Sequence, residues 1–316
     1  MSEAGASIPE AAKQSTEFTA KQFDLADPKA YLVWREEKLA GYPQSAQDLR
    51  VNLTDLGQPT NGEKSSIVAM CRRASMAIYH TNVQSESAQT TADIRLSIRR
   101  FGAALGLGDT ETHRSADDDG IVAIEVTQAD TKRGFIPYTN KALSWHTDGY
   151  YNPVSAPIKG MLLHCVHPAA QGGINALLDP EIAYIRLRDK NPAMVAALMH
   201  PEAMTIPESL EDDGSVRTVS VGPVFFIDKL GRMTMRYTAR TRSIHWREDA
   251  DTLAAVALLN RLLAHEEEPL IIKYKLSANE GLISNNVLHA RTAFENGESA
   301  ARLLYRVRYK DRIGGT

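Results

Sequence analysis

The sequence predicts a mainly β fold, either a barrel or a double sheet, with helices attached to it. From about Gly120 onward, short apolar segments rich in β-branched and aromatic residues alternate with turn residues. They show no regular strand–helix alternation of the kind that marks a parallel α/β sheet. The expected strands are GIVAIEV (120–126), IKGMLLHCVH (158–167), TVSVGPVFFID (218–228), RMTMRYT (232–238), LIIKYKL (270–276), GLISNNVLHA (281–290) and ARLLYRVRY (301–309).

The N-terminal part is expected to be a flexible arm followed by helices. Residues 1–20 are rich in Ser, Ala, Glu and Gln, so burial would not repay the entropy of ordering them. Structure is expected to begin near Phe23. Thr60 and Glu63 have the spacing of a capping box, which predicts the start of a helix. Apolar residues at helical spacing over 94–105 predict a second helix.

Three further helices are expected to interrupt the β segments. Asp179 precedes Pro180, and Asn191 precedes Pro192, so each pair matches an N-cap and a first helical residue. Residues 250–264 place large aliphatic side chains on one helical face. We interpret these three helices as elements attached to a β core.

Composition and charge favour small-molecule chemistry. The 316 residues are 43% hydrophobic and 24% charged, and the net charge is −3. These values are typical of a globular protein and give no attraction to nucleic acid or to an anionic membrane. Neither a signal peptide nor a membrane-spanning segment is recognisable, so we expect a cytoplasmic location. Cys71 and Cys165 are expected to be buried free thiols, and the sequence leaves a homo-oligomer open.

The segment SWHTDGYY (144–151) contains a candidate metal site. Residues i and i+2 of an extended strand point to the same face, so His146 and Asp148 can bind one ion. This pair alone is weak, and a core or surface histidine is the alternative. NNVLHAR (285–291) supplies a distant third ligand, His289. Two imidazoles and one carboxylate leave three octahedral positions open, as in non-haem Fe(II) oxygenases, whereas a closed zinc site needs a fourth protein ligand.

Arginines recur in the segment ARLLYRVRY (301–309). Alternation at period two places Arg302, Arg306 and Arg308 on one strand face. Guanidinium groups inside a barrel need anionic partners. The pattern therefore indicates that one arginine binds a carboxylate of a dianionic cosubstrate through two parallel hydrogen bonds. A second arginine is left to pair with the substrate or with an acidic residue of the protein. An exposed strand face with solvated charges is the alternative.

Taken together, the motifs resemble those of the Fe(II)/2-oxoglutarate-dependent dioxygenases of the taurine dioxygenase (TauD/TfdA) superfamily. The resemblance rests on WHTD, on a Gly-Gly segment after Pro168, on NNVLHAR and on RLLYRVR, in this order. It covers about residues 135–310. HTDGYY followed by LLHC is particularly similar to the γ-butyrobetaine hydroxylase branch. The substrate is much less well indicated than the superfamily.

The resemblance implies a double-stranded β-helix, or jelly roll, with the metal in its open mouth. Residues 21–316 would form a single dioxygenase domain. Within it, residues 21–140 would be an N-terminal α/β buttress and 141–316 the jelly-roll core, with a helical insertion at about 179–265.

The resemblance also implies roles for individual residues. His146, Asp148 and His289 would bind Fe(II) and form the catalytic centre. Halogenating relatives replace the carboxylate with a small residue, so retention of Asp148 implies hydroxylation or another oxidation. The implied reaction consumes 2-oxoglutarate and O₂, releases succinate and CO₂, and oxidises a C–H bond of a small anionic or zwitterionic metabolite.

Three residues are implied to contact the cosubstrate. Arg302 would bind the distal carboxylate of 2-oxoglutarate. Arg306 stands where many members have a second arginine, which contacts 2-oxoglutarate or an anionic substrate. Asn175 occupies the position at which the family usually has threonine, and its amide can donate the same hydrogen bond.

Two features suggest opposite substrate charges. Tyr150 and Tyr151 would suit a quaternary ammonium group through cation–π attraction. On a strand, however, at most one of them would face the pocket, and core packing is the alternative. Arg240 and Arg242, two residues apart, would instead suit a carboxylate, sulfonate or phosphonate. A solvated loop is the alternative for these arginines.

Two other functional classes remain at this stage. One is a non-catalytic jelly-roll protein that binds a metal or senses a ligand, but such a protein has no reason to retain Arg302 with all three metal ligands. The other is a metal hydrolase with the same triad, from which consumption of 2-oxoglutarate would distinguish an oxygenase.

Overall fold

The computed structural model describes residues 21–81, 90–111, 117–127, 136–210, 214–242, 244–264, 268–298 and 300–316. The arm expected for residues 1–20 lies outside them. The helices are α1 (Pro28–Gly41), α2 (Asn61–Ala74), α3 (Thr91–Ala104), α4 (Pro180–Lys190), α5 (Pro192–Leu198) and α6 (Ala250–Ala264).

Nineteen short strands are assigned within the described residues. In chain order they are β1 (Arg50–Leu53), β2 (Met76–Thr81), β3 (Val122–Ile124), β4 (Leu143–His146), β5 (Gly160–His167), β6 (Gln171–Gly172), β7 (Asn175–Leu178), β8 (Met204–Ile206), β9 (Ser209–Leu210), β10 (Val216–Arg217), β11 (Ser220–Gly222), β12 (Phe225–Ile227), β13 (Met233–Met235), β14 (His245–Trp246), β15 (Ile272–Tyr274), β16 (Glu280–Ser284), β17 (Leu288–Arg291), β18 (Phe294–Glu295) and β19 (Leu303–Tyr309).

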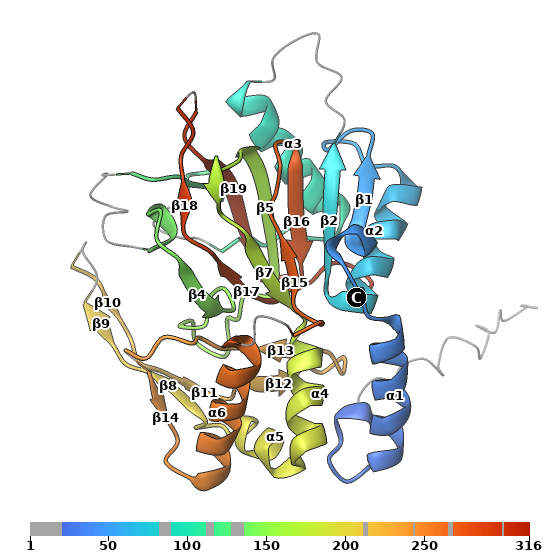
Figure 1. Ribbon diagram of the computed structural model, residues 1–316, viewed down its shortest axis with the longest axis vertical. Helices are drawn as coiled ribbons and strands as arrows, with labels where there is room; N and C mark the ends of the chain where they lie inside the picture. The colour runs from blue at the N-terminus through green and yellow to red at the C-terminus, as the bar shows by residue number, and fades with distance from the viewer. Residues whose placement is uncertain are drawn as a thin grey trace, which may run out of the picture.

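Two sheets form the jelly roll. The larger has the order β1-β2-β16-β5-β19-β3 and the smaller the order β15-β7-β17-β4. The chain passes repeatedly from one sheet to the other, since β16 pairs in the larger sheet and β17, the next strand, pairs in the smaller one. Figure 1 shows the strands of the two sheets gathered in the upper part of the molecule. The mainly β fold is therefore confirmed.

Side chains of alternate residues on β5 enter two different cores. Met161 and Leu163 lie in the same apolar cluster as Leu177 and Leu288 of the smaller sheet. Leu162 instead joins the cluster that contains residues of α2 and α3. The larger sheet is therefore buried on both faces, because the smaller sheet covers one face and α2 and α3 cover the other. These helices and the strands β1 and β2 lie in the part of the chain expected to be the N-terminal buttress.

Local bonding at the helix starts follows the sequence. The Thr60 hydroxyl accepts from the Glu63 N–H at 3.2 Å, and the Glu63 carboxylate accepts from the Thr60 N–H at 2.7 Å. Asp179 and Asn191 cap α4 and α5. These three predictions are confirmed. Helix α1 was missed, although Asp27 caps it and a proline follows, as at Asp179. The same N-cap pattern would have identified it.

The insertion lies between β7 and β15. It contains α4, α5 and α6 together with the small strands β8 to β14, and Figure 1 shows the three helices grouped below the two sheets. Strands β1 and β2, from the N-terminal part, belong to the same sheet as β16. For this reason we infer that residues 21–316 form one domain, with 21–140 as its buttress.

Two expected strands are each divided in two. GLISNNVLHA forms β16 and β17, because Asn286 between them has a φ of 54°, in the left-handed region. Asparagine tolerates this conformation better than most residues. TVSVGPVFFID forms β11 and β12, which are separated at Pro223, a residue without an N–H for a sheet hydrogen bond. The continuous strands predicted at both places were wrong.

Cys71 and Cys165 are buried free thiols, as expected. Burial raises the pKa of the Cys165 thiol to about 12, so this thiol is not a reactive thiolate at neutral pH. Among the helices of the described residues, none is long and apolar enough to cross a bilayer.

Gly281→Ala is expected to destabilise the protein by about 3 kcal/mol, because overpacking of a close-packed core usually costs up to about that much. A methyl group at this position of β16 would collide with the ring and hydroxyl of Tyr79 and with the Leu163 carbonyl. Gly62→Ala, on α2, would meet only the Thr60 hydroxyl at 4.0 Å and serves as the control. Urea unfolding of both variants tests this, and equal midpoints would contradict it.

Candidate active site

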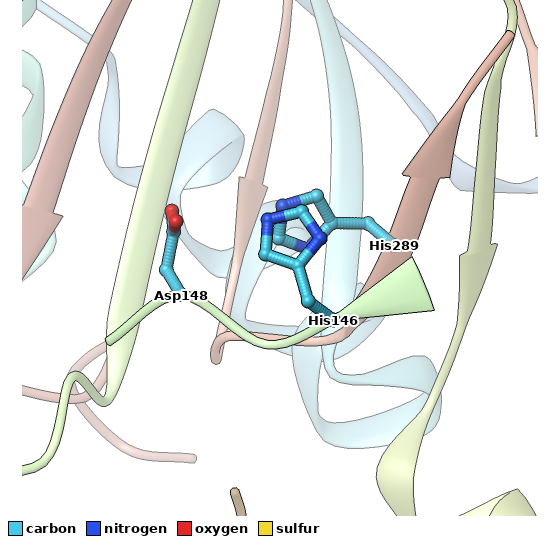
Figure 2. Close-up of side chains that lie close together, drawn as sticks. All are labelled: His146, Asp148 and His289. Carbon is cyan, nitrogen blue, oxygen red and sulfur yellow. The ribbon is translucent and has the colours of Figure 1, made fainter. Parts of the chain in front are cut away.

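The three predicted metal ligands come together at the mouth of the jelly roll. His289 of β17 is the direct register partner of His146 at the end of β4, and their ring centroids are 4.2 Å apart. One potential ligand atom from each imidazole and one from the Asp148 carboxylate lie within 4.8 Å of one another. Figure 2 shows the carboxylate of Asp148 facing the two rings. Among the described residues, these three form the one group of this kind.

The sequence argument placed Asp148 on the same strand as His146, and this detail was wrong. Strand β4 ends at His146, and Asp148 lies in the turn that follows. Figure 2 nevertheless shows the side chains of His146 and Asp148 rising from the same side of the chain, and their ligand atoms lie within 4.8 Å of one another. The prediction that these two side chains lie on the same side, within reach of one ion, is met, although Asp148 does not belong to the strand.

Both imidazoles are held in the state that binds a metal. Nδ1 of His146 lies 2.9 Å from the Ser144 carbonyl, and Nδ1 of His289 lies 2.9 Å from the Val287 carbonyl. A carbonyl oxygen only accepts, so each Nδ1 carries the proton and each Nε2 keeps its lone pair. Burial lowers the pKa of His146 to about 3 and also lowers that of His289. Both rings are therefore neutral at physiological pH, with fixed orientations.

The Asp148 carboxylate is ionised and incompletely paired. Burial alone would raise its pKa, but the guanidinium groups of Arg306 and Arg308 outweigh this effect and hold the pKa well below its usual range. Arg306 lies 3.3 Å and Arg308 3.8 Å from Oδ1. The other oxygen, Oδ2, is buried without a hydrogen-bond partner. A buried anionic oxygen in this state, opposite two neutral imidazoles, fits a divalent cation such as Fe(II).

Asn286 fixes the turn that carries Asp148, a role that sequence reasoning missed. Its side-chain oxygen accepts from the Asp148 N–H at 2.8 Å, and its Nδ2 donates to the carbonyls of Asp148 and Ile158 at 2.9 and 2.7 Å. The Asn286 amide thus connects the turn that contains Asp148 to the chain just before β17. The sequence does contain a signal for this role, because two adjacent asparagines interrupt an otherwise apolar strand pattern.

Asn286→Gly, which retains the left-handed backbone, is expected to weaken Fe(II) binding about 10- to 100-fold, the usual effect of removing a partner that orients a metal ligand. Asn285→Ala is a matched control, because Asn285 bonds instead to Ile313 and Thr316 near the C-terminus. Anaerobic Fe(II) titration measures the affinity of each variant. If both substitutions weaken iron binding equally, Asn286 has no specific role.

The arginines of β19, and Arg302 just before it, are buried, so the exposed-strand alternative was wrong. Arg302, Arg306 and Arg308 are 4%, 7% and 5% exposed. Arg308 is neutralised by Glu111, whose carboxylate lies 2.5 Å from it, and it donates to the Tyr151 hydroxyl at 2.9 Å. Sequence reasoning missed Glu111, which lies far from Arg308 in the chain. Arg302 and Arg306 each retain a buried nitrogen with no hydrogen-bond partner.

Arg302 lies in a position suited to a carboxylate. Its guanidinium carbon is 4.8 Å from the centre of the Phe294 ring. A side chain on Gly173, which has a φ of 69°, would come within 3.6 Å of its Nε, so the glycine leaves that approach open. Burial lowers the Arg302 pKa without supplying an acidic partner. Asn175 is also buried, but its Nδ2 donates to the Tyr274 carbonyl at 3.3 Å, which leaves it one N–H.

Arg291 lies close to Arg302 but has a structural role. Its guanidinium carbon is also 4.8 Å from the centre of the Phe294 ring. Its Nη2 donates to the carbonyls of Thr139 and Lys141, at 2.9 and 2.6 Å, in the segment that leads into β4. Burial lowers its pKa to about 10. Arg291 therefore supports the backbone around the site.

Tyr150 and Tyr151 both lie near the predicted metal ligands. They follow Asp148 in the turn and at its end, so the strand argument that separated them does not apply. The Tyr150 ring meets the His146 ring edge-on with centroids 6.4 Å apart, and the two tyrosine rings are 5.2 Å apart. Arg240 donates to the Tyr150 hydroxyl at 3.2 Å. Arg242, two residues further on, is exposed.

The chain matches known oxygenases in sequence and fold. Residues 82–308 match the family model described as "Taurine catabolism dioxygenase TauD, TfdA family". A uridine-5'-phosphate dioxygenase from Streptomyces sp is 28% identical over 81% of this chain and 91% of the relative. A second protein of that name, from Amycolatopsis sp, is 26% identical over 69% of this chain and 77% of the relative.

A solved structure of asparagine oxygenase with Fe(II), 3-hydroxyasparagine and succinate shares the fold. It has a TM-score of 0.57 and 14% identity, and the match covers 83% of this chain and 93% of that one. The family model spans more than half of the chain and includes every residue of the site described above. The chain therefore belongs to the taurine catabolism dioxygenase (TauD, TfdA) family and is an Fe(II)- and 2-oxoglutarate-dependent dioxygenase.

Proposed function

We propose that His146, Asp148 and His289 bind the catalytic iron, and that the enzyme oxidises a C–H bond of a small anionic metabolite. The observation that carries this proposal is the donor set: two neutral imidazoles with free Nε2 atoms facing an ionised carboxylate with an unpaired oxygen. Bound iron, together with 2-oxoglutarate and O₂, supplies the oxidising chemistry. The protein's own groups orient the three side chains, keep Nε2 of each imidazole free of a proton and keep the carboxylate ionised.

We propose that Arg302 receives the distal carboxylate of 2-oxoglutarate. Its buried, unpaired NH1 and the neighbouring Phe294 ring support this, because an arginine buried without an acidic partner is costly until an anion binds. The planar guanidinium can form two parallel hydrogen bonds to a carboxylate. Asn175 is a weaker candidate for the same carboxylate, since one of its N–H groups is already engaged.

The charges around the site favour an anionic substrate. Three buried arginines, at positions 302, 306 and 308, are opposed by the carboxylates of Asp148 and Glu111. The two positive charges of iron offset the two negative charges of 2-oxoglutarate, so one positive charge remains. We assign this remaining positive charge to Arg306, whose Nε is buried without a hydrogen-bond partner. Arg306 would then contact the anionic substrate or the cosubstrate. Both named relatives suggest a phosphate monoester of the uridine type.

A zwitterionic trimethylammonium substrate is the second candidate. The γ-butyrobetaine hydroxylase-like motif predicts it, and the paired rings of Tyr150 and Tyr151 are the observation in its favour. Against it, Arg240 contacts the hydroxyl of one ring, and Arg217 lies over the other at 5.6 Å. Positive groups at both rings would repel a cation.

Succinate release from the Fe(II)-loaded enzyme tests the proposed substrate class. The panel contains uridine-5'-phosphate, uridine, taurine and γ-butyrobetaine, each with 2-oxoglutarate and O₂. We expect uridine-5'-phosphate to stimulate succinate release most, and uridine much less because it lacks the anionic group. Stimulation by γ-butyrobetaine alone would favour the second candidate. Stimulation by neutral uridine equal to that by its phosphate would contradict the charge argument.

A further inference from the structure

Arg240 reaches the mouth of the site from the insertion. Thr238 forms an isolated antiparallel bridge with His146, and the Ala239 N–H donates to the Trp145 carbonyl at 2.8 Å. The chain therefore runs beside the end of β4 and then delivers Arg240 to the Tyr150 hydroxyl. The Arg240 guanidinium is exposed, and the Tyr150 ring that it contacts is the one that meets His146 edge-on.

A buried arginine fixes this arrangement. Arg236, 4% exposed, donates through Nε to the Tyr150 carbonyl at 2.8 Å and through its other nitrogens to the carbonyls of Ser220 and Met204, at 2.8 and 3.1 Å. It thereby joins the turn after Asp148 to β8 and β11 of the insertion. Arg236 and Arg240 belong to the same short segment, and Arg236 is bonded to the Tyr150 carbonyl. The position of Arg240 relative to Tyr150 is therefore fixed.

The hydroxyl of Tyr150 and the guanidinium of Arg240 can both donate a hydrogen bond to the same ligand group. The Tyr150 hydroxyl accepts from Arg240, so its own proton remains available to an acceptor. The guanidinium has five N–H groups, and the tyrosine hydroxyl engages one of them. Because Arg240 is exposed, it can bind an anion without first losing a buried partner. Arg308, in contrast, is held by Glu111.

We propose that Arg240 and the Tyr150 hydroxyl together bind the anionic group of the substrate at the mouth of the site, so that Arg240 determines specificity. Arg217, over the Tyr151 ring, adds positive charge on the same side. The ligand class is a phosphate monoester or a chemically similar oxyanion, whose oxygens accept from both donors. This inference rests on the proposed function, because it requires an anionic substrate.

The test compares Arg240→Gln with Arg242→Gln, a matched substitution of an exposed arginine two residues away. Succinate release is measured with uridine-5'-phosphate and with uridine. We expect Arg240→Gln to raise KM for uridine-5'-phosphate about 10- to 100-fold, the usual effect of losing a hydrogen bond to a charged group. KM for 2-oxoglutarate and any turnover of uridine are expected to stay unchanged. Arg242→Gln is expected to behave as the wild type.

The outcomes separate this inference from the proposed function. If the wild type responds to uridine-5'-phosphate and Arg240→Gln has an unchanged KM, the inference is wrong and the proposed function stands. It is also wrong if Arg240→Gln impairs uridine and uridine-5'-phosphate equally, because the residue would then be structural. If no anionic compound of the panel, uridine-5'-phosphate or taurine, stimulates the wild type, the proposed substrate class fails and the inference fails with it.

Discussion

Replacing His289 with alanine is expected to abolish stoichiometric Fe(II) binding and to reduce turnover by at least about 100-fold. Removing a residue that only hydrogen-bonds to a metal ligand already lowers metal affinity or activity by up to about 100-fold, and removing the ligand itself should cost more. The physical reason is geometric. His289 pairs directly with His146, and its Nε2 is available because Nδ1 is bonded to the Val287 carbonyl. Without it, one imidazole and one carboxylate remain, too few to hold iron against solvent.

Anaerobic titration measures this prediction. Fe(II) and then 2-oxoglutarate are added to the apoprotein, and the visible charge-transfer absorption is followed. His164→Gln is the control, because His164 is also a buried, neutral imidazole but lies against Tyr79, with its Nδ1 3.1 Å from the hydroxyl. The control should bind one equivalent of iron. One equivalent bound by His289→Ala, with normal absorption, would show that the ligand assignment is wrong.

Replacing Arg302 with glutamine is expected to raise KM for 2-oxoglutarate by about 30- to 1,000-fold, which corresponds to about 2–4 kcal/mol for a buried charge pair that loses one partner. Iron binding without cosubstrate should be unchanged, because Arg302 has no contact with the three ligands among the hydrogen bonds and ion pairs of the described residues. Arg302→Lys should recover only part of the affinity, since an ammonium group cannot form the two parallel bonds of a guanidinium.

Arg291→Gln provides the contrast for Arg302. Both guanidinium groups lie 4.8 Å from the centre of the Phe294 ring, but Arg291 is bonded to backbone carbonyls. Its replacement should lower the free energy of unfolding and leave KM for 2-oxoglutarate near the wild-type value. The cosubstrate assignment would be refuted by the reverse pattern, in which Arg291→Gln impairs 2-oxoglutarate binding and Arg302→Gln does not.

Features that depend on neighbouring residues could be predicted from the sequence. The capping bonds of Thr60 and Asp179 join groups two or three residues apart, so the residue types alone indicate them. The alternation on β19 was predictable for the same reason. The grouping of His146, Asp148 and His289 was predictable because a compact His-x-Asp motif and a histidine at a strand end have few structural interpretations once they occur together.

Features that depend on distant contacts could not be predicted. The pairing of Glu111 with Arg308 joins an irregular segment after α3 to the last strand, and nothing local in either segment marks it. The contact of Arg240 with Tyr150 depends on where the insertion returns to β4. At Asn286, side-chain bonds to the ligand turn and a left-handed φ override the strand pattern of the surrounding apolar residues.

The link between Asp148 and Asn286 spans 138 positions of the chain. An active centre built from such remote segments gives the domain a high contact order, and closing a loop of that length is slow relative to forming local helices. During synthesis, His146 and Asp148 leave the ribosome long before His289 exists. On the proposed assignment, the complete set of three iron ligands exists only in the folded chain, so iron binding would stabilise the native state relative to the unfolded chain. Iron binding at the proposed site would therefore show that this long loop has closed.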